Sequence, residues 1–200
     1  MESTILFRDF EERDIDFVYN CKNDEKLNSM IVGQFKPFSH EDAKKWVYGC
    51  MGEHDNFKFW ALCTNDEEKR IVGWVAISDI DKINKSAFFY SQVIGDSKYR
   101  NGLPWIEIQQ YVLDFVFEKL CFDSFSYSCL TIHPTSMSMG PVLFFENPIV
   151  QKDAICKDGI LYDLATFTLK RKTYVNHRNL GDYELTSLIE RYATYRRKKK

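Results

Sequence analysis

The chain has 200 residues, of which 44% are hydrophobic and 16% aromatic, so it is large and apolar enough to fold as one domain around its own core. This composition excludes global disorder, and no apolar run approaches the ~18 residues that a membrane-spanning helix needs. The net charge of −2 hides an asymmetry: residues 170–200 hold 10 Lys/Arg against 3 Asp/Glu, a net of +7, which leaves −9 for residues 1–169. An acidic body favours a cationic partner.

The six cysteines are scattered through apolar segments, and none belongs to a C-x-x-C pair. This spacing argues against a zinc site and against a disulfide framework, and no other metal-ligand pattern is present. We therefore expect reduced, buried thiols in a cytoplasmic protein without a metal centre. The first residues also lack the basic and then apolar pattern of a secretory signal peptide.

The first part of the chain predicts a short strand and then two helices. Ile5–Arg8 has the alternation of a strand, and Asp14 is placed to cap the first helix. Ser39 and Asp42 have the spacing of a capping box for the second helix, and Gly52 suits its end.

Three strand-like segments follow at residues 57–64, 71–80 and 86–94. Because the turns between them are short and polar, we expect an antiparallel meander. A long helix should begin near Pro104, a good residue for a first helical turn, and another strand should cover residues 125–132. Two strands joined through a helix make a β-α-β unit, so the third and fourth of these strands should pair in parallel.

The rest of the chain predicts a short helical piece at residues 142–146, a last strand at 161–169 and a C-terminal helix. Five apolar side chains repeat there at helical spacing: Leu185, Leu188, Ile189, Tyr192 and Tyr195. We expect one unit over residues 1–176 and an amphipathic helix with a basic end over 177–200. Burying the apolar stripe should dock this helix, either on its own chain or, exchanged between two copies, in a homodimer.

Four segments carry a family pattern in their order and spacing: residues 6–14 (LFRDFEERD), 71–77 (IVGWVAI), 93–100 (VIGDSKYR) and 153–159 (DAICKDG). Together they resemble the GCN5-related N-acetyltransferase (GNAT) superfamily, nearest its ribosomal-protein-alanine and spermidine acetyltransferase branch. The resemblance covers roughly residues 4–176. It implies an α+β architecture of the α/β GNAT type, with a mixed, centrally splayed β-sheet flanked by helices.

The resemblance also implies acetyl-CoA as the co-substrate. In the superfamily, backbone N–H groups of a strand-to-helix loop and the helix dipole bind the CoA pyrophosphate. Nine residues are expected at the cofactor: Gln92, Val93, Ile94, Arg100, Asn101, Gly102, Leu103, Pro104 and Trp105. The family loop is R-G-x-G-x-G/A, whereas this chain keeps a single glycine, and Pro104 removes one N–H donor.

The acid–base positions of the family differ here as well. Phe89 occupies the usual place of a carboxylate base, and Phe145 that of a tyrosine acid. The nearest surviving candidates for a base are Asp79, which we prefer, and Asp81, with a plain turn residue as the other interpretation of each. Ser138 maps onto an Asn that contacts the cofactor, and it is our candidate to protonate or position the thiol. Amine acetylation needs little more than a proton acceptor and a polarised thioester carbonyl.

The resemblance implies a primary amine acceptor, either a small molecule such as a polyamine or amino sugar, or a protein N-terminus. Phe35 and Phe38 are expected to form an aromatic wall for it, because the loop after the first helix lines the acceptor site in this family. Packing in the core is the other interpretation of both rings.

Two interpretations from other classes stay open. The changed loop and the missing base are also typical of a catalytically degenerate GNAT-like binding or scaffold protein. The basic C-terminal end could contact nucleic acid, but no RNA-reading motif accompanies it, so neither nucleic acid nor a membrane is expected as a partner.

Overall fold

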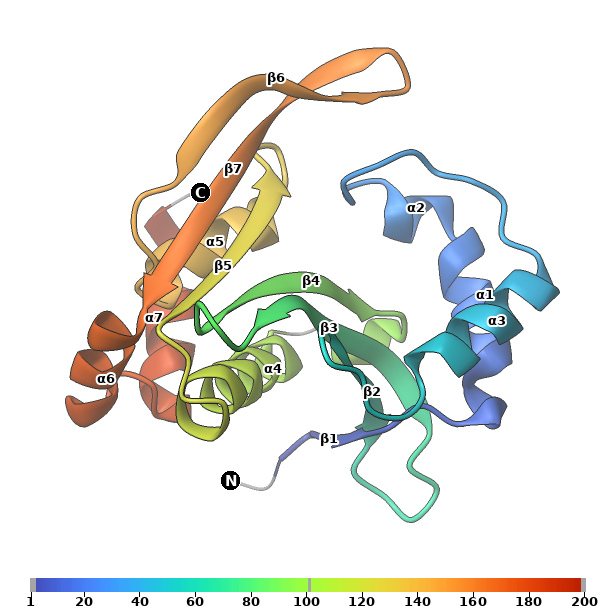
Figure 1. Cartoon of the computed structure of the whole chain (residues 1–200), viewed down its shortest axis with the longest axis horizontal. Helices are drawn as coiled ribbons and strands as arrows, with labels where there is room; N and C mark the ends of the chain where they lie inside the picture. The colour runs from blue at the N-terminus through green and yellow to red at the C-terminus, as the bar shows by residue number, and fades with distance from the viewer. Residues whose placement is uncertain (1–2, 101, 199–200) are drawn as a thin grey trace.

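A computed structural model describes residues 3–100 and 102–198. Seven strands form one mixed sheet in the order β1-β2-β3-β4-β5-β7-β6 (Figure 1). The strands are β1 Ile5–Arg8, β2 Lys58–Thr64, β3 Ile71–Asp81, β4 Ser86–Ile94, β5 Ser124–Leu130, β6 Ile149–Lys157 and β7 Ile160–Lys170. The helices are α1 Ile15–Asn23, α2 Glu25–Asn28, α3 His40–Cys50, α4 Leu103–Asp114, α5 Pro134–Val142, α6 Arg171–Asn179 and α7 Leu185–Lys198. The expected mixed sheet flanked by helices is confirmed.

The N-terminal half follows the sequence pattern closely. Strands β1 to β4 pair in antiparallel order, as the short polar turns predicted. The capping box is present at α3, where the Ser39 hydroxyl accepts from Asp42 N and the Asp42 carboxylate accepts from Ser39 N. Asp14 is the N-cap residue of α1, as predicted, but its side chain makes no capping hydrogen bond to this helix. Both of its carboxylate oxygens accept instead from the Arg8 guanidinium, at 2.7 and 2.8 Å.

The parallel pairing predicted for the β-α-β unit is confirmed over a short stretch. Ser86–Phe89 of β4 lies beside Ser124–Tyr127 of β5. The connecting helix α4 begins at Leu103, with Gly102 as its N-cap at φ 97°, and continues into one π-helical turn, Phe115–Lys119. Gly102 suits this position because a residue with a Cβ atom is strained at positive φ.

Two helices differ from the prediction. The helical piece expected at 142–146 is wrong: α5 begins at Pro134, where the ring of His133 accepts from Ser136 N, and the chain leaves the helix before Phe144 at φ 63°. Helix α6 was not expected, because Tyr174 is its single buried residue and it shows no apolar stripe. The boundary expected between residues 176 and 177 lies inside α6.

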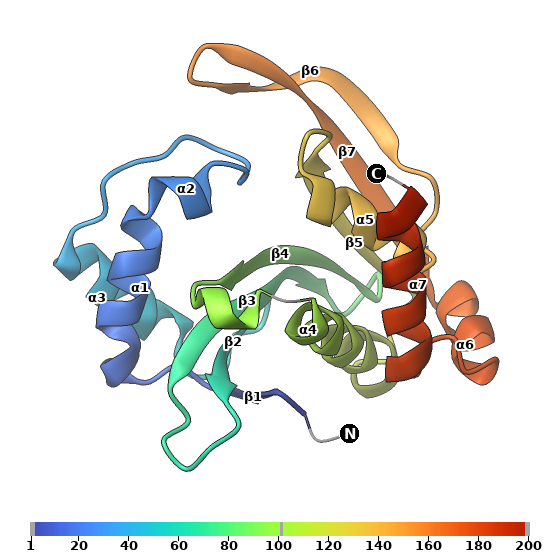
Figure 2. The same cartoon turned by 180° about the vertical axis from the view of Figure 1, so that it is seen from behind.

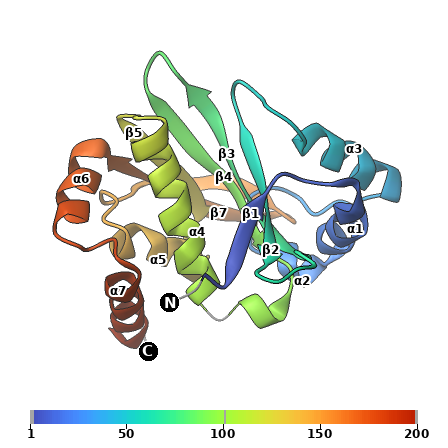
Figure 3. The ribbon, with the colours of Figure 1, turned by 90° about the horizontal axis from the view of Figure 1, so that it is seen from below.

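The sheet carries a hydrophobic cluster on each face. Helices α1 and α3 pack on one face with Trp74 and Ala61, whereas α4, α5 and α7 pack on the other with Val75 and Leu62 (Figure 3). Helix α7 lies along α4 and α5 of its own chain, and its Leu188 is 0% exposed (Figure 2). The expectation that this helix docks on its own chain is therefore confirmed. Among the described helices, none has the length and apolarity that crossing a membrane requires.

Candidate active site

The central feature of the sheet is a splay between β4 and β5. In the described part of these strands, parallel pairing ends at Phe89 and Tyr127. Beyond that point β4 stays paired with β3, from Ser91 to Ile94, while β5 stays paired with β7 up to Leu130. Each strand therefore keeps its outer neighbour and turns a backbone edge with no strand partner toward the gap, so these edges can bind an extended ligand.

A tight turn follows β4 on the cofactor side of the splay. Asp96 caps the short 3-10 helix Ser97–Tyr99 and forms an ion pair with Arg70 at 2.9 Å. Burial raises the pKa of Asp96, but backbone and Arg70 hydrogen bonds outweigh it, so its pKa lies below the ordinary value. The Arg100 guanidinium donates to the carbonyl oxygens of Ile94 (2.7 Å) and Gly95 (2.6 Å). Arg100 therefore folds back on the strand end, which it stabilises.

The start of α4 is the place where the sequence expects the pyrophosphate, and α7 lies against it. A Cβ atom on Gly102 would lie 3.2 Å from Cε1 of Tyr192, so the Tyr192 ring contacts this turn. Trp105 is buried, and its ring centroid lies 5.0 Å from that of Tyr192. Leu103 and Pro104 complete the first helical turn, and Asn101 lies outside the described residues.

The three cofactor candidates on β4 alternate between the two faces of the sheet. Val93 packs in the cluster under α1 and α3, and Ile94 packs in the opposite cluster. The Gln92 amide oxygen accepts from Gln109 of α4 at 2.6 Å. The strand and the helix beyond it are thus joined directly at the splay. Among the described residues, the cofactor candidates of β4 and of the first turn of α4 lie together there.

The core beside β5 is aromatic and apolar. Tyr127 stacks on Phe167 with centroids 4.8 Å apart, and Phe145 meets it edge to face at 5.0 Å. Burial raises the pKa of Tyr127, whose hydroxyl donates to Ser136 O. Phe145 is buried and has no group that can donate a proton, so Tyr127 carries the one hydroxyl of this aromatic set.

The two catalytic candidates lie far from each other in the fold. Ser138 is buried in α5, beside the splay, and its hydroxyl donates to Thr135 O at 2.6 Å. Asp79 is exposed in a β3 bulge near the start of β4, the end at which β4 and β5 are still paired. Its φ of 50° and its contact with the Ser78 hydroxyl are typical of a turn residue. The structure does not bring Asp79 to the splay.

The acceptor candidates lie in residues 29–39, which we call the acceptor loop. Both backbone groups of Phe38 bind the Asn23 side chain, at 2.9 and 2.8 Å, and the Phe38 ring packs in the cluster of α1 and α3. Phe35 is half-buried. Burial lowers the pKa of Lys22, whose Nζ lies 4.8 Å from the Trp46 ring centroid and 5.8 Å from that of Phe38.

All six cysteines are free, as the spacing predicted. Cys121 and Cys156 are exposed, which corrects the expectation that every thiol is buried; both lie beside turns. Burial raises the pKa of Cys21, Cys63 and Cys129 to about 11, so these thiols stay protonated and inert. Within residues 3–100 and 102–198, no three His, Cys, Asp or Glu side chains are grouped to hold a metal ion.

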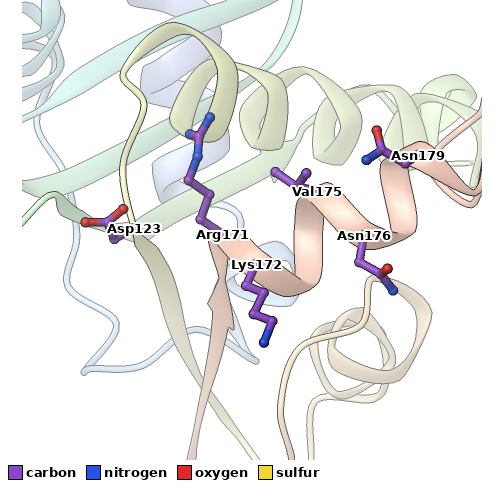
Figure 4. A pocket seen from close by; sticks show the side chains of 6 residues that line it. All are labelled: Asp123, Arg171, Lys172, Val175, Asn176 and Asn179. Carbon is purple, nitrogen blue, oxygen red and sulfur yellow. The ribbon is translucent and has the colours of Figure 1, made fainter.

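A surface hollow elsewhere on the molecule is not part of this site. It is lined by Asp123, Arg171, Lys172, Val175, Asn176 and Asn179 (Figure 4). Asp123 lies just before β5 and the other five residues belong to α6, which follows β7, so the hollow lies at the end where β4 and β5 are still paired. The Arg171 guanidinium donates to Phe117 O, so it already has a structural hydrogen-bond partner.

Two structural residues at the site could not be found from local pattern. Tyr192 belongs to the apolar stripe of α7 and shows no signal that it would reach Gly102. Lys157 ends β6, and its sequence context is that of a lysine beside a turn, but it is buried against the acceptor loop.

Comparison with known proteins agrees with this geometry. A family model described as acetyltransferase (GNAT) domain matches residues 4–139. Spermidine N-acetyltransferase from Vibrio cholerae, solved with CoA and spermine, superposes with a TM-score of 0.74 at 17% identity, covering 88% of this chain and 100% of that one. A GNAT-family acetyltransferase from Bacillus anthracis gives 0.72 at 18% identity, covering 86% and 98%. No curated protein sequence matches the chain.

Proposed function

The chain belongs to the GNAT acetyltransferase family and is an N-acetyltransferase that uses acetyl-CoA, and from this premise we propose that its acceptor is a small polyamine. The observation that carries acetyl transfer at this site is the splay of β4 and β5, which ends beside the start of α4. It supplies the two elements that an acyl-CoA needs, an open strand edge and a helix N-terminus.

The residues of the cofactor side fit acetyl-CoA in part. We propose that the β4 edge at Gln92–Ile94 binds the pantetheine and that residues 100–105 bind the pyrophosphate. Gly102 lets backbone approach a phosphate, and the α4 dipole favours negative charge there. Pro104 offers no N–H, and the Tyr192 ring lies on the side of Gly102 where a Cβ atom would stand. We propose that this ring narrows the approach of the phosphates to the turn.

The net charge of the chain supports a cationic acceptor, and the packing of helices on the sheet indicates the side from which it approaches. Residues 1–169 carry a net charge of −9, which attracts a polycation. Since α4, α5 and α7 cover one face, the free side of the splay is the one bordered by α1, α3 and the acceptor loop. The V. cholerae neighbour was solved with spermine, which supports a polyamine here. We propose that Phe35 and Phe38 border the acceptor.

The acid–base step needs few groups from the protein. A polyamine nitrogen attacks the thioester carbonyl after losing a proton, and then the thiolate of CoA takes a proton as it leaves. We propose that solvent removes the first proton, because Asp79, our candidate base, lies at the paired end of β3. Ser138 remains our proposed donor or positioning residue for the thiol, from its place in α5.

Calorimetric titration of the full chain with acetyl-CoA tests the cofactor site. We expect saturable heat at one site per chain, lost on addition of excess CoA. No heat would favour the degenerate binding or scaffold alternative over the enzyme.

We also propose a cytoplasmic location, supported by the six free cysteines. A homodimer stays a prediction, because α7 covers its apolar stripe on its own chain and needs no second copy for that. Light scattering on the full chain and on a chain ending at residue 183 tests it.

A further inference from the structure

The acceptor loop is attached to a distant part of the fold by one buried lysine. Lys157 Nζ donates to three carbonyl oxygens: Asn28 at 3.2 Å, Ser29 at 2.7 Å and Ile31 at 3.1 Å. An ammonium group has three N–H donors, and all three are used here. Three charge-assisted hydrogen bonds to one chain segment fix that segment in place.

The burial of Lys157 is produced by the loop itself. Lys157 is 6% exposed, although Ile160 and Leu161, just after the turn, are 56% and 55% exposed. We call residues 156–159 the hairpin tip. It contains a two-residue turn, Asp158-Gly159, with φ angles of 52° and 79°. Such a turn is rigid, so Lys157 extends from a fixed support.

A second contact joins the same two segments. The Gln34 amide donates to Cys156 O at 3.1 Å, and its oxygen accepts from Asp158 N at 3.4 Å. The other end of the acceptor loop is held by Asn23, which binds both backbone groups of Phe38. Between Gln34 and Phe38 only Phe35, Lys36 and Pro37 remain, so the position of Phe35 is set from both sides.

These contacts cross the splay. The acceptor loop joins α2 to α3, and α1 and α3 pack on the face of β2 and β3. The hairpin tip belongs to the β5-β7-β6 side of the sheet. In Figure 1 the β6–β7 hairpin extends from one side toward α2 on the other. The two sides part at Phe89 and Tyr127, and Lys157 reconnects them on the face from which an acceptor would enter.

We infer that Lys157 is a positioning residue for the amine acceptor: it holds the acceptor loop across the splay and so sets the affinity for the polyamine. The inference rests on the proposed function. It predicts that acceptor binding and cofactor binding respond differently, because the described cofactor candidates lie on β4, in the turn after it and on α4, whereas Lys157 donates to Asn28, Ser29 and Ile31. Acceptor binding should depend on this lysine, and acetyl-CoA binding should not.

The test compares Lys157→Met with Lys152→Met, which removes an exposed lysine of the same hairpin that pairs with Asp163. In acetylation of spermidine, Lys157→Met should raise the acceptor KM at least about tenfold with kcat within about twofold, the pattern of lost uniform binding. The acetyl-CoA Kd should be unchanged in both variants. Amide hydrogen exchange should accelerate in residues 29–39 of Lys157→Met and stay unchanged in Lys152→Met.

Gln34→Ala provides the second variant, since Gln34 is exposed and its loss leaves the core intact. It should shift the acceptor KM in the same direction by a smaller factor. An unchanged acceptor KM in Lys157→Met overturns the inference, as does a parallel loss of acetyl-CoA affinity. If the wild type binds spermidine by calorimetry without acetylating it, the proposed function fails, and weaker spermidine binding by Lys157→Met still supports the inference. If the wild type binds no spermidine, both fail.

Discussion

Arg8 and Asp14 join β1 to the start of α1 through a paired guanidinium and carboxylate. The Asp14 side chain is 1% exposed and that of Arg8 is 15% exposed. The Asp14 hydrogen bond raises the pKa of Arg8, and it outweighs the burial that acts against the charged form. Because Asp14 also accepts from Glu11 N, its charge organises the whole entry to α1.

Arg8→Met should therefore destabilise the protein by about 3–5 kcal/mol, because it leaves a buried carboxylate without its cation. Arg70→Met is the matched control, since the Arg70 side chain is 46% exposed and an ion pair with an exposed partner is worth about 1 kcal/mol or less. Urea denaturation measures both. Equal losses in the two variants would contradict the account of Arg8.

His133 makes the stability depend on pH. Burial lowers its pKa below the ordinary value, and the ring accepts from Ser136 N through Nδ1, which requires the neutral form. The stability that neutral His133 contributes is fully present above its pKa in the unfolded chain, about 6.5. This stability is lost as the pH falls through its lower pKa in the folded protein.

His133→Asn keeps an N-cap that accepts a hydrogen bond but does not titrate. Between about pH 7.5 and about pH 5, the free energy of unfolding should fall more for the wild type than for His133→Asn. Urea titrations at the two pH values give this difference. Parallel losses would mean that His133 does not titrate with folding.

At the scale of the elements, α7 is the part that the family likeness explains least. Leu188 of α7 is fully buried against the rest of the protein, and Leu185 and Ile189 pack beside it. Leu188→Ala should cost about 2–5 kcal/mol. Glu190→Ala, on the exposed side of the same helix, should cost no more than about 0.5 kcal/mol. A neutral Leu188→Ala in a thermal or urea melt would show that α7 is not docked in solution.

We expect Tyr192 to link α7 to the affinity for acetyl-CoA. Tyr192→Ala removes the ring from Gly102, so acetyl-CoA should bind more tightly. The Kd should fall by about tenfold if the form with the ring displaced is about one tenth populated in the wild type. Tyr192→Phe keeps the ring and should leave the Kd unchanged. Calorimetry measures all three proteins, and weaker binding by Tyr192→Ala would instead make the ring part of the site.

The elements differ in how far the sequence predicts them, for physical reasons. The strands β2, β3 and β4 could be predicted because short apolar runs bounded by polar turns leave a local pattern. Helix α6 could not, since it buries a single tyrosine, and α5 was misplaced because its start depends on the cap by His133.

The candidate site shows the same division. The turn from β4 to α4 is continuous in the chain, so its residues could be named from the family likeness. The contacts of Tyr192 with Gly102 and of Lys157 with Ser29 join segments far apart in the chain, and no local pattern contains them. Asp79 was chosen by its carboxylate alone, and the register of β3 with β4 places it at the paired end.

At the scale of the whole molecule, two sets of contacts span the splay between β4 and β5. On one face α7 packs against both α4 and α5, and on the other the hairpin tip meets the acceptor loop through Lys157 (Figures 1 and 2). In the proposed function, the acetyl-CoA and the acceptor therefore lie on different sides of the sheet and meet at the splay. This arrangement suits a reaction in which a thioester and an amine approach from opposite faces.

The most direct test of this account is a single reaction. The purified full chain is incubated with acetyl-CoA and spermidine, and acetylated spermidine and free CoA thiol are both quantified, with protein-free and acceptor-free controls. The account predicts acetylspermidine and thiol in equal amounts, formed only when all three components are present. Saturable acetyl-CoA binding without any acetylspermidine, or thiol released equally without spermidine, would contradict it.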